Sequence, residues 1–88
     1  MASMSAKQET YPVLIKPDGT RHALRLSEVA KAIGGAPESV ELEEDLVLVV
    51  NDNFLALQLP LNEEASGLAK TLIQGPAVLM TQEQWFAL

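Results

Sequence analysis

The stretch LVLVVNDNFLALQLPLN, residues 46–62, decides the fold that this sequence predicts. It holds two apolar runs, residues 46–50 and 54–59, on either side of Asp52 and Asn53. Aspartate and asparagine tolerate the positive φ of a two-residue hairpin loop, so we expect two antiparallel strands joined by this turn. Both faces of such a hairpin are apolar, and both need cover. We expect the helices to cover one face, and a terminal segment or a second subunit to cover the other.

The stretch ends in a strand-to-helix junction at Pro60 and Asn62. Proline has no N–H to donate, so Pro60 is expected to end the second strand. Asn62 is placed to cap a helix over residues 62–75 that stops at Gly75. In the alternative interpretation, Asn62 lines a pocket and binds a ligand or a partner's backbone. Gly67 lies within this helix at a cost of about 1 kcal/mol relative to alanine, which indicates that something packs closely there.

The N-terminal third of the chain predicts a hairpin followed by a helix. The segment YPVLIKPDGTRHALRL, residues 11–26, holds two short strands around a Pro-Asp-Gly turn in which Gly19 takes the positive φ. Ser27 precedes apolar residues at helical spacing. We therefore expect a short helix that is capped by Ser27 and stops at Gly34 or Gly35.

Two more strands and a terminal helix complete the predicted fold. After a turn at residues 36–39, the segment VELEE (40–44) alternates as a half-buried strand does. The segment AVLMT (77–81) predicts a further strand, and Thr81 with Gln84 has the spacing of a capping box for one or two last helical turns. These elements predict an α+β fold with a small, mostly antiparallel sheet of five to six short strands and two short helices.

Length and composition predict one small domain. The chain has 88 residues, of which 48% are hydrophobic and 20% charged, and we expect a flexible tail over residues 1–9 and a single α+β domain over 10–88. A domain of this size buries little surface, so a homo-oligomer is a possibility. The sequence contains no cysteine, which excludes disulfides and thiolate chemistry. No apolar run is long enough to cross a bilayer, and we expect a cytoplasmic protein without membrane contact.

Charge divides the chain into two unequal parts. Residues 1–33 carry a net charge of +2 and residues 34–88 a net charge of −8. The total of −6 argues against direct nucleic-acid binding, which depends on neutralised phosphates. Five acids fall within eight residues: Glu38, Glu41, Glu43, Glu44 and Asp45. They form either a solvated strand edge and turn, or an acidic face that binds a basic protein partner.

Two aromatic residues, Trp85 and Phe86, lie close to the end of the sequence. Large aromatic side chains need burial, either over the domain's own sheet or against another subunit or partner. Both residues are therefore further candidates for partner binding.

Catalytic and metal-binding patterns are missing from the sequence. His22 is the single histidine, and no serine stands in a nucleophile-elbow setting. The carboxylates of the acidic run have polar surroundings, which do not favour acid–base catalysis. No calcium loop and no glycine-rich phosphate loop is present. We therefore expect no enzymatic activity, no cofactor and no metal.

Four segments together resemble a family of small domains of unknown function encoded by bacteriophages, plasmids and other mobile elements: IGGAPESVEL, LVLVVNDNFLALQLPLN, EEASGLA and IQGPAVLM. The resemblance covers residues 33–80. Asn53 replaces the glycine usual at the family's turn, and Trp85 is not part of its pattern. The matching residues, as a candidate site or as joints of the fold, are Gly34, Gly35, Glu41, Asn51, Pro60 and Asn62.

The resemblance implies a mobile-element setting and no established activity, which leaves three hypotheses. The first is a non-catalytic protein that binds a host protein stoichiometrically, as an inhibitor or modulator, through the acidic run. The second is an oligomer that sequesters a small molecule or nucleotide between subunits. Its candidate ligand-binding residues are Asn62, Arg21, Arg25 and Asn51. The third is a structural or assembly role.

Overall fold

The computed structural model describes residues 11–88; the predicted tail, residues 1–9, lies outside this range. The strands are β1 (Val13–Ile15), β2 (Arg21–Ala23), β3 (Pro37–Glu41), β4 (Leu46–Asn51) and β5 (Ala77–Thr81). The helices are the 3-10 helix η1 (Leu26–Glu28), α2 (Val29–Ile33), α3 (Glu63–Ala69) and α4 (Gln82–Phe86). The α+β class and the small antiparallel sheet are confirmed.

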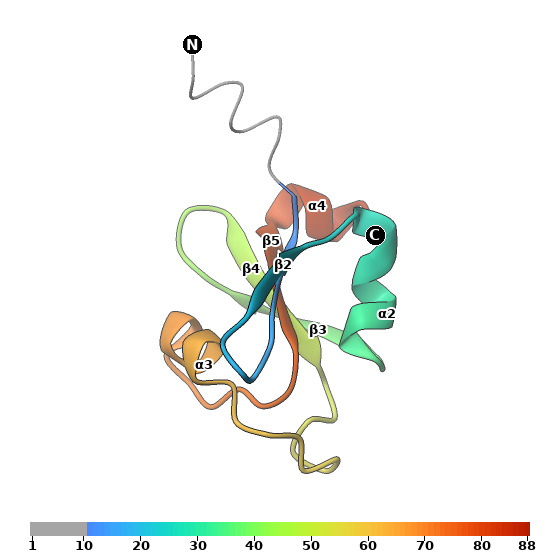
Figure 1. Cartoon of the computed structure of the whole chain (residues 1–88). Coiled ribbons are helices and arrows are strands. Elements are labelled where there is room, and N and C mark those ends of the chain that lie inside the picture. Colours follow the sequence, from blue (N-terminus) through green and yellow to red (C-terminus); the bar gives the residue numbers. More distant parts are fainter. Residues whose placement is uncertain (1–10) are drawn as a thin grey trace.

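All five strands form one antiparallel sheet in the order β2-β1-β5-β4-β3 (Figure 1). The apolar strands β4 and β5 lie at its centre, where Leu48 is opposite Leu79 and Val49 is opposite Val78. The charged strands β2 and β3 form its two edges. This order follows from burial, because a central strand is covered on both faces and an edge strand meets water.

Each face of the sheet carries its own core. On one face Val29 and Ile33 of α2 pack with Val47 and Val49 of β4. On the other face Ala65 of α3 packs in a core with Leu48, Val50, Ile73 and Ala77. Figure 1 shows α2 and α4 on one side of the sheet and α3 on the other. The prediction that α2 and α3 share one face is therefore wrong, since one helix covers each face.

The prediction of a second hairpin strand over residues 54–59 is also wrong. Strand β4 ends at Asn51, and residues 52–58 form consecutive turns. The Oδ1 atom of Asn51 accepts the Asn53 N–H at 2.8 Å, and the Leu57 N–H donates to the Asn53 carbonyl at 3.0 Å. These bonds bend the chain away from the sheet. Strand β4 has no free side for a further strand, because β3 and β5 already flank it.

A tight hairpin does exist, but it joins β3 to β4. The Leu46 N–H donates to the Glu43 carbonyl at 3.3 Å across Glu44 and Asp45, whose φ angles are 62° and 63°. Two consecutive positive φ angles define the type I′ turn of two-residue hairpins. Strand β3 begins at Pro37, inside the segment predicted as a turn, and ends before the turn acids. The predicted strand over 40–44 is thus displaced toward the N-terminus.

Helix α3 starts as predicted but is shorter. The Oδ1 atom of Asn62 accepts the Ala65 N–H at 3.1 Å, which confirms the cap. The helix is followed by Lys70, where φ is 57°, and Gln74 then pairs with Leu61 in an isolated antiparallel bridge. The Gly75 N–H donates to the Pro60 carbonyl at 2.7 Å. Pro60 therefore begins a short pairing with this segment and does not end a strand.

Among the smaller local predictions, three are confirmed and two are wrong. Gly19 has φ of 92° in the β1–β2 turn, and Gly34 ends α2 with φ of 78°. The capping box is present, since the Gln84 N–H donates to Thr81 Oγ1 at 3.0 Å. Ser27 does not cap a helix, because it lies inside η1. Nothing packs against Gly67, where an added Cβ would meet no atom within 4 Å.

Candidate functional site

The predicted acidic residues lie together along the free edge of the sheet. Glu38 and Glu41 belong to β3, and Glu43, Glu44 and Asp45 form the turn into β4; all five side chains are exposed. Glu38 is opposite Val50 and Glu41 is opposite Val47, so the two strand carboxylates point to opposite faces of the sheet. The acidic edge is therefore accessible from both faces.

Two hollows lie beside β3 on the face that α3 covers. The first, about 570 Å³, lies between β3, the 52–56 turns and residues 71–73, and Val40, Leu55 and Leu72 line it together with Glu38 and Asp52. The second, about 530 Å³, lies between the β3–β4 hairpin and the end of α3, with a lining that includes Leu42, Leu68, Glu43, Glu44 and Lys70. We call β3 with these two hollows the β3 groove.

The exposed leucines of the β3 groove are the functional candidates that sequence reasoning missed. Leu55 is 63% exposed and Leu72 is 52% exposed. The sequence predicted Leu55 in a strand of the sheet, and Leu68 and Leu72 in the stripe of a longer helix. The chain turns before each pattern is complete, which leaves the leucines at the surface. The only signal in the sequence was the excess of apolar residues on both faces of the predicted hairpin.

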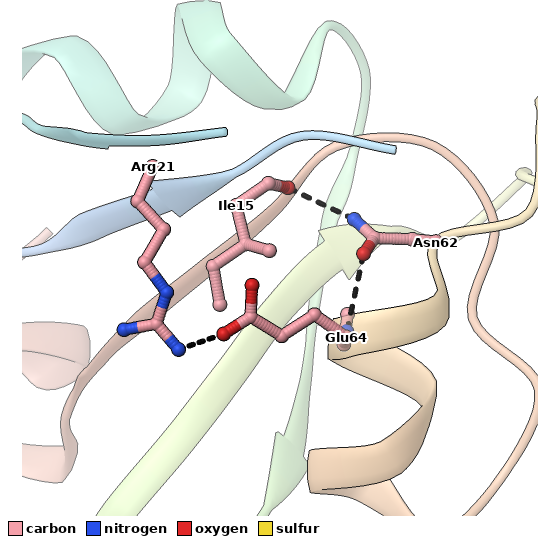
Figure 2. A network of polar contacts seen from close by, with 5 residues as sticks. Ile15, Arg21, Asn62 and Glu64 are labelled. Carbon is pink, nitrogen blue, oxygen red and sulfur yellow. Dashed lines mark hydrogen bonds and ion pairs between the residues drawn. The ribbon is translucent and has the colours of Figure 1, made fainter. Parts of the chain in front are cut away.

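The opposite edge of the sheet is basic, and the chain itself partly covers it. Arg21 of β2 forms an ion pair with Glu64 of α3, as Figure 2 shows. The main-chain N–H of Arg25 donates to Glu28 Oε1 at 2.8 Å. His22 is exposed on the same strand. The predicted ligand-binding arginines thus lie with different acidic neighbours and do not converge on one site.

Asn62 is a buried joint of the fold. Its Nδ2 atom donates to the Ile15 carbonyl at 2.9 Å, as Figure 2 shows. The same atom donates to the Gly75 carbonyl at 2.8 Å, while Oδ1 accepts the Ala65 N–H. The side chain is 0% exposed. Both amide protons are therefore used within the protein, and the side chain has no surface open to a ligand. The structure supports the interpretation of Asn62 as a joint.

Asn51 joins a second pair of segments. Its Oδ1 atom accepts the Asn53 N–H, and its Nδ2 atom lies 3.4 Å from the Ile33 carbonyl at the end of α2. A Cβ at Gly35 would lie 2.6 Å from Nδ2, so the second glycine of the Gly-Gly pair leaves room for this amide. The signature residues Gly35, Asn51, Pro60 and Asn62 thus connect segments, and of the matching set Glu41 alone lies in the groove.

The two aromatic candidates differ in their surroundings. Trp85 is partly buried against the α2 face of the sheet, so it covers the domain's own core. Phe86 is 76% exposed on α4. Phe86 lines neither hollow of the β3 groove, although α4 begins beside the acidic turn, where the Gln82 N–H donates to the Asp45 carbonyl at 2.8 Å.

Three further observations bound the chemistry of residues 11–88. Within this range no group of three or more His, Cys, Asp or Glu side chains could hold a metal ion. Hydrogen bonds from the Thr20 hydroxyl and N–H lower the pKa of Asp18 below its usual value of 3.8, in the exposed β1–β2 turn. None of the helices described here is long and apolar enough to span a bilayer.

A five-stranded antiparallel sheet with helices on both faces defines this protein as a small α+β domain. The chain belongs to the family described as Domain of unknown function (DUF3846), whose model matches residues 2–85. The predicted membership in a family of unknown function is confirmed, and the match extends beyond residues 33–80 to most of the chain. The chain has no match among the curated proteins and none among the solved structures.

Proposed function

We propose that this domain, encoded by a phage or another mobile element, is a non-catalytic protein that binds a basic host protein stoichiometrically, as an inhibitor or modulator. The β3 groove is the binding surface. The observation that carries the proposal is the placement of five exposed carboxylates and of exposed leucines at one free edge of the sheet.

The groove combines the two features that protein recognition uses. Buried apolar anchors supply most of the binding free energy at an interface, and Leu55, Leu68 and Leu72 are available for that purpose. Complementary charge at the rim accelerates association and excludes wrong partners. A partner with apolar anchors and basic residues around them fits this surface.

The backbone of the acidic turn also favours a binding role over a purely structural one. Glu44 and Asp45 both hold positive φ angles, which asparagine and glycine adopt at lower cost. A turn selected for stability alone would carry Asn-Gly. Strained positions concentrate at functional sites, and here the strain lies at Glu44, whose carboxylate lines the second hollow.

Charge reversal within the groove tests the proposal. The variant Glu41→Lys/Glu43→Lys is compared with Glu63→Lys/Glu83→Lys, which reverses two exposed carboxylates outside the groove. Each tagged full-length protein captures proteins from cells that encode it, and native mass spectrometry of the purified complex gives its stoichiometry. We expect the groove variant to lose a one-to-one partner that the control retains, and melting curves to show that both variants are folded. Equal capture by both variants would contradict the proposal.

The sequestering alternative depends on the first hollow. Its volume of about 570 Å³ is in the range of small-molecule sites, but Glu38 and Asp52 line it and the buried Asn62 does not. A ligand there would be cationic. Native mass spectra of gently purified protein would show its additional mass, whereas bare protein would leave the protein-binding function as the proposal.

A further inference from the structure

Along β3 the main-chain N–H and carbonyl groups alternate between two directions, toward β4 and away from the sheet. The Leu42 N–H donates to the Leu46 carbonyl at 2.8 Å, and the Asp52 N–H donates to the Ala36 carbonyl at 2.9 Å. Residues of an antiparallel pair alternate between bonding the neighbour and pointing away from it. Even-numbered residues of β3 therefore bond β4, whereas the N–H and carbonyl groups of Ser39 and Glu41 point outward. Within residues 11–88 no strand pairs with this edge.

Two of the even-numbered residues, which bond β4, also line the hollows. Val40 lines the first and Leu42 the second, and both residues pack on the α3 face of the sheet. Glu41 and Ser39 are opposite Val47 and Val49, whose side chains lie on the other face. A strand added beside β3 would place every second side chain over the hollows. The side chains between them would lie on the other face, close to the Glu41 carboxylate.

We propose that the partner segment binds as a sixth strand, antiparallel to β3, with apolar side chains over the two hollows and lysine or arginine at the positions between them. This inference rests on the proposed function and specifies its partner. Main-chain bonds to Ser39 and Glu41 supply the pairing, as in other complexes formed by strand addition. The acidic rim selects the basic residues of the added strand.

A second copy of this domain fits the edge less well than a foreign segment. Two β3 strands side by side would bring the acidic run of one copy next to the acidic run of the other, and like charges brought together at an interface are unfavourable. The other free edge, β2, consists of Arg21, His22 and Ala23. It has no large aliphatic side chain for the hollows, and Arg21 is already paired with Glu64. The occupant is therefore a segment of another protein.

Two peptides of identical charge test the direction and the mode of pairing. Both are fluorescent octapeptides of alternating lysine and valine; one is N-methylated at every valine amide and the other at every lysine amide. In antiparallel addition the lysine residues bond Ser39 and Glu41. Fluorescence anisotropy with the full-length protein should show the valine-methylated peptide binding at least tenfold more tightly. Equal affinities, no binding, or tighter binding of the lysine-methylated peptide would overturn the proposal.

Variants at Ser39 separate this proposal from the proposed function. Ser39→Pro removes one outward N–H and leaves the bonds to β4 and every carboxylate in place, whereas Ser39→Ala keeps the N–H. We expect only the proline variant to lose binding of the valine-methylated peptide, by about tenfold, while both melt as the native protein does. If Ser39→Pro retains the captured partner and Glu41→Lys/Glu43→Lys loses it, strand addition fails and the acidic binding surface stands. If Ser39→Pro does not fold, the affinities of the two N-methylated peptides for the native protein test strand addition without it.

Discussion

The two edges of the sheet deal with the same problem in opposite ways. An edge strand has unpaired main-chain groups that invite another strand. The β2 edge is three residues long, and the Arg21–Glu64 pair ties it to α3, above the buried joint made by Asn62. The β3 edge is five residues long, carries acids and opens onto two hollows. The comparison indicates that the chain itself partly covers the β2 edge, the closed side, and that the β3 edge, the open side, has room for the partner that we propose.

Loss of the Asn62 joint should have the largest effect on the closed side. Asn62→Ala removes three buried hydrogen bonds, to the Ile15 and Gly75 carbonyls and from the Ala65 N–H. Unsatisfied buried groups cost about 1–3 kcal/mol each, so we expect a loss of about 3–5 kcal/mol in the free energy of unfolding. Urea denaturation measures it. Asn53→Ala, in an exposed turn, is the control, and equal losses in both variants would mean that Asn62 is not a joint.

A side chain at Gly35 should disturb the start of β3 to a smaller extent. Gly35→Ala places a Cβ 2.6 Å from Asn51 Nδ2, and overpacking of this kind costs about 1–3 kcal/mol. Gly67→Ala adds the same methyl group at a position where the new Cβ meets no atom within 4 Å. It should stabilise the protein by about 0.5–1 kcal/mol, because alanine favours the helix. Thermal melts of the two variants should therefore shift in opposite directions. A shift in the same direction would contradict the packing described here.

Relaxing the acidic turn should separate stability from binding on the open side. Glu44→Asn/Asp45→Gly supplies the residues that a type I′ turn prefers, and we expect a gain of about 1–2 kcal/mol in the free energy of unfolding. The same variant removes two carboxylates of the acidic run, of which Glu44 lines the groove, so partner capture should weaken. A variant that is neither more stable nor weaker in binding would show that this turn is neither strained nor part of the site.

The ion pair of the closed edge should contribute little to stability. The Arg21 and Glu64 side chains are 49% and 32% exposed, and pairs this exposed contribute about 0.2–1 kcal/mol. A double-mutant cycle with Arg21→Gln and Glu64→Gln should give a coupling free energy in that range, which decreases in high salt. A coupling several times larger would mean that the pair, and not the buried joint, holds the edge.

The β1–β2 turn should show the smallest effect, as a pH dependence. The folded pKa of Asp18 is lowered below 3.8 by hydrogen bonds from Thr20, so its stabilising contribution is present above about pH 4 and is lost as the pH falls through the folded pKa. In Thr20→Ala the hydroxyl donor is gone, and the Asp18 pKa should rise toward 3.8. Carboxyl NMR titration of both proteins measures the change. An unchanged pKa would assign the shift to a cause other than the hydroxyl.

Local signals in the sequence were sufficient at three places where a residue acts on its own neighbours, although they failed for the predicted Ser27 cap. The Asn62 cap, the Thr81–Gln84 box and the Gly19 turn each depend on bonds that span a few residues. The hairpin at Asp52 and Asn53 failed because a turn signal does not state whether its flanking strand has a free edge to pair with. The five acids were identified as candidates, but nothing in their spacing indicated the leucines that lie beside them.

The sequence by itself determined the α+β class, the apolar central strands, the caps and the acidic segment, because periodicity, capping and charge are properties of neighbouring residues. Only the tertiary structure decided which strands became edges, which face each helix covers, and that Leu55, Leu68 and Leu72 stay exposed beside β3. These outcomes depend on competition between distant segments for the two sides of β4. The physical reason is that a strand has two edges, and β3 and β5 occupied both.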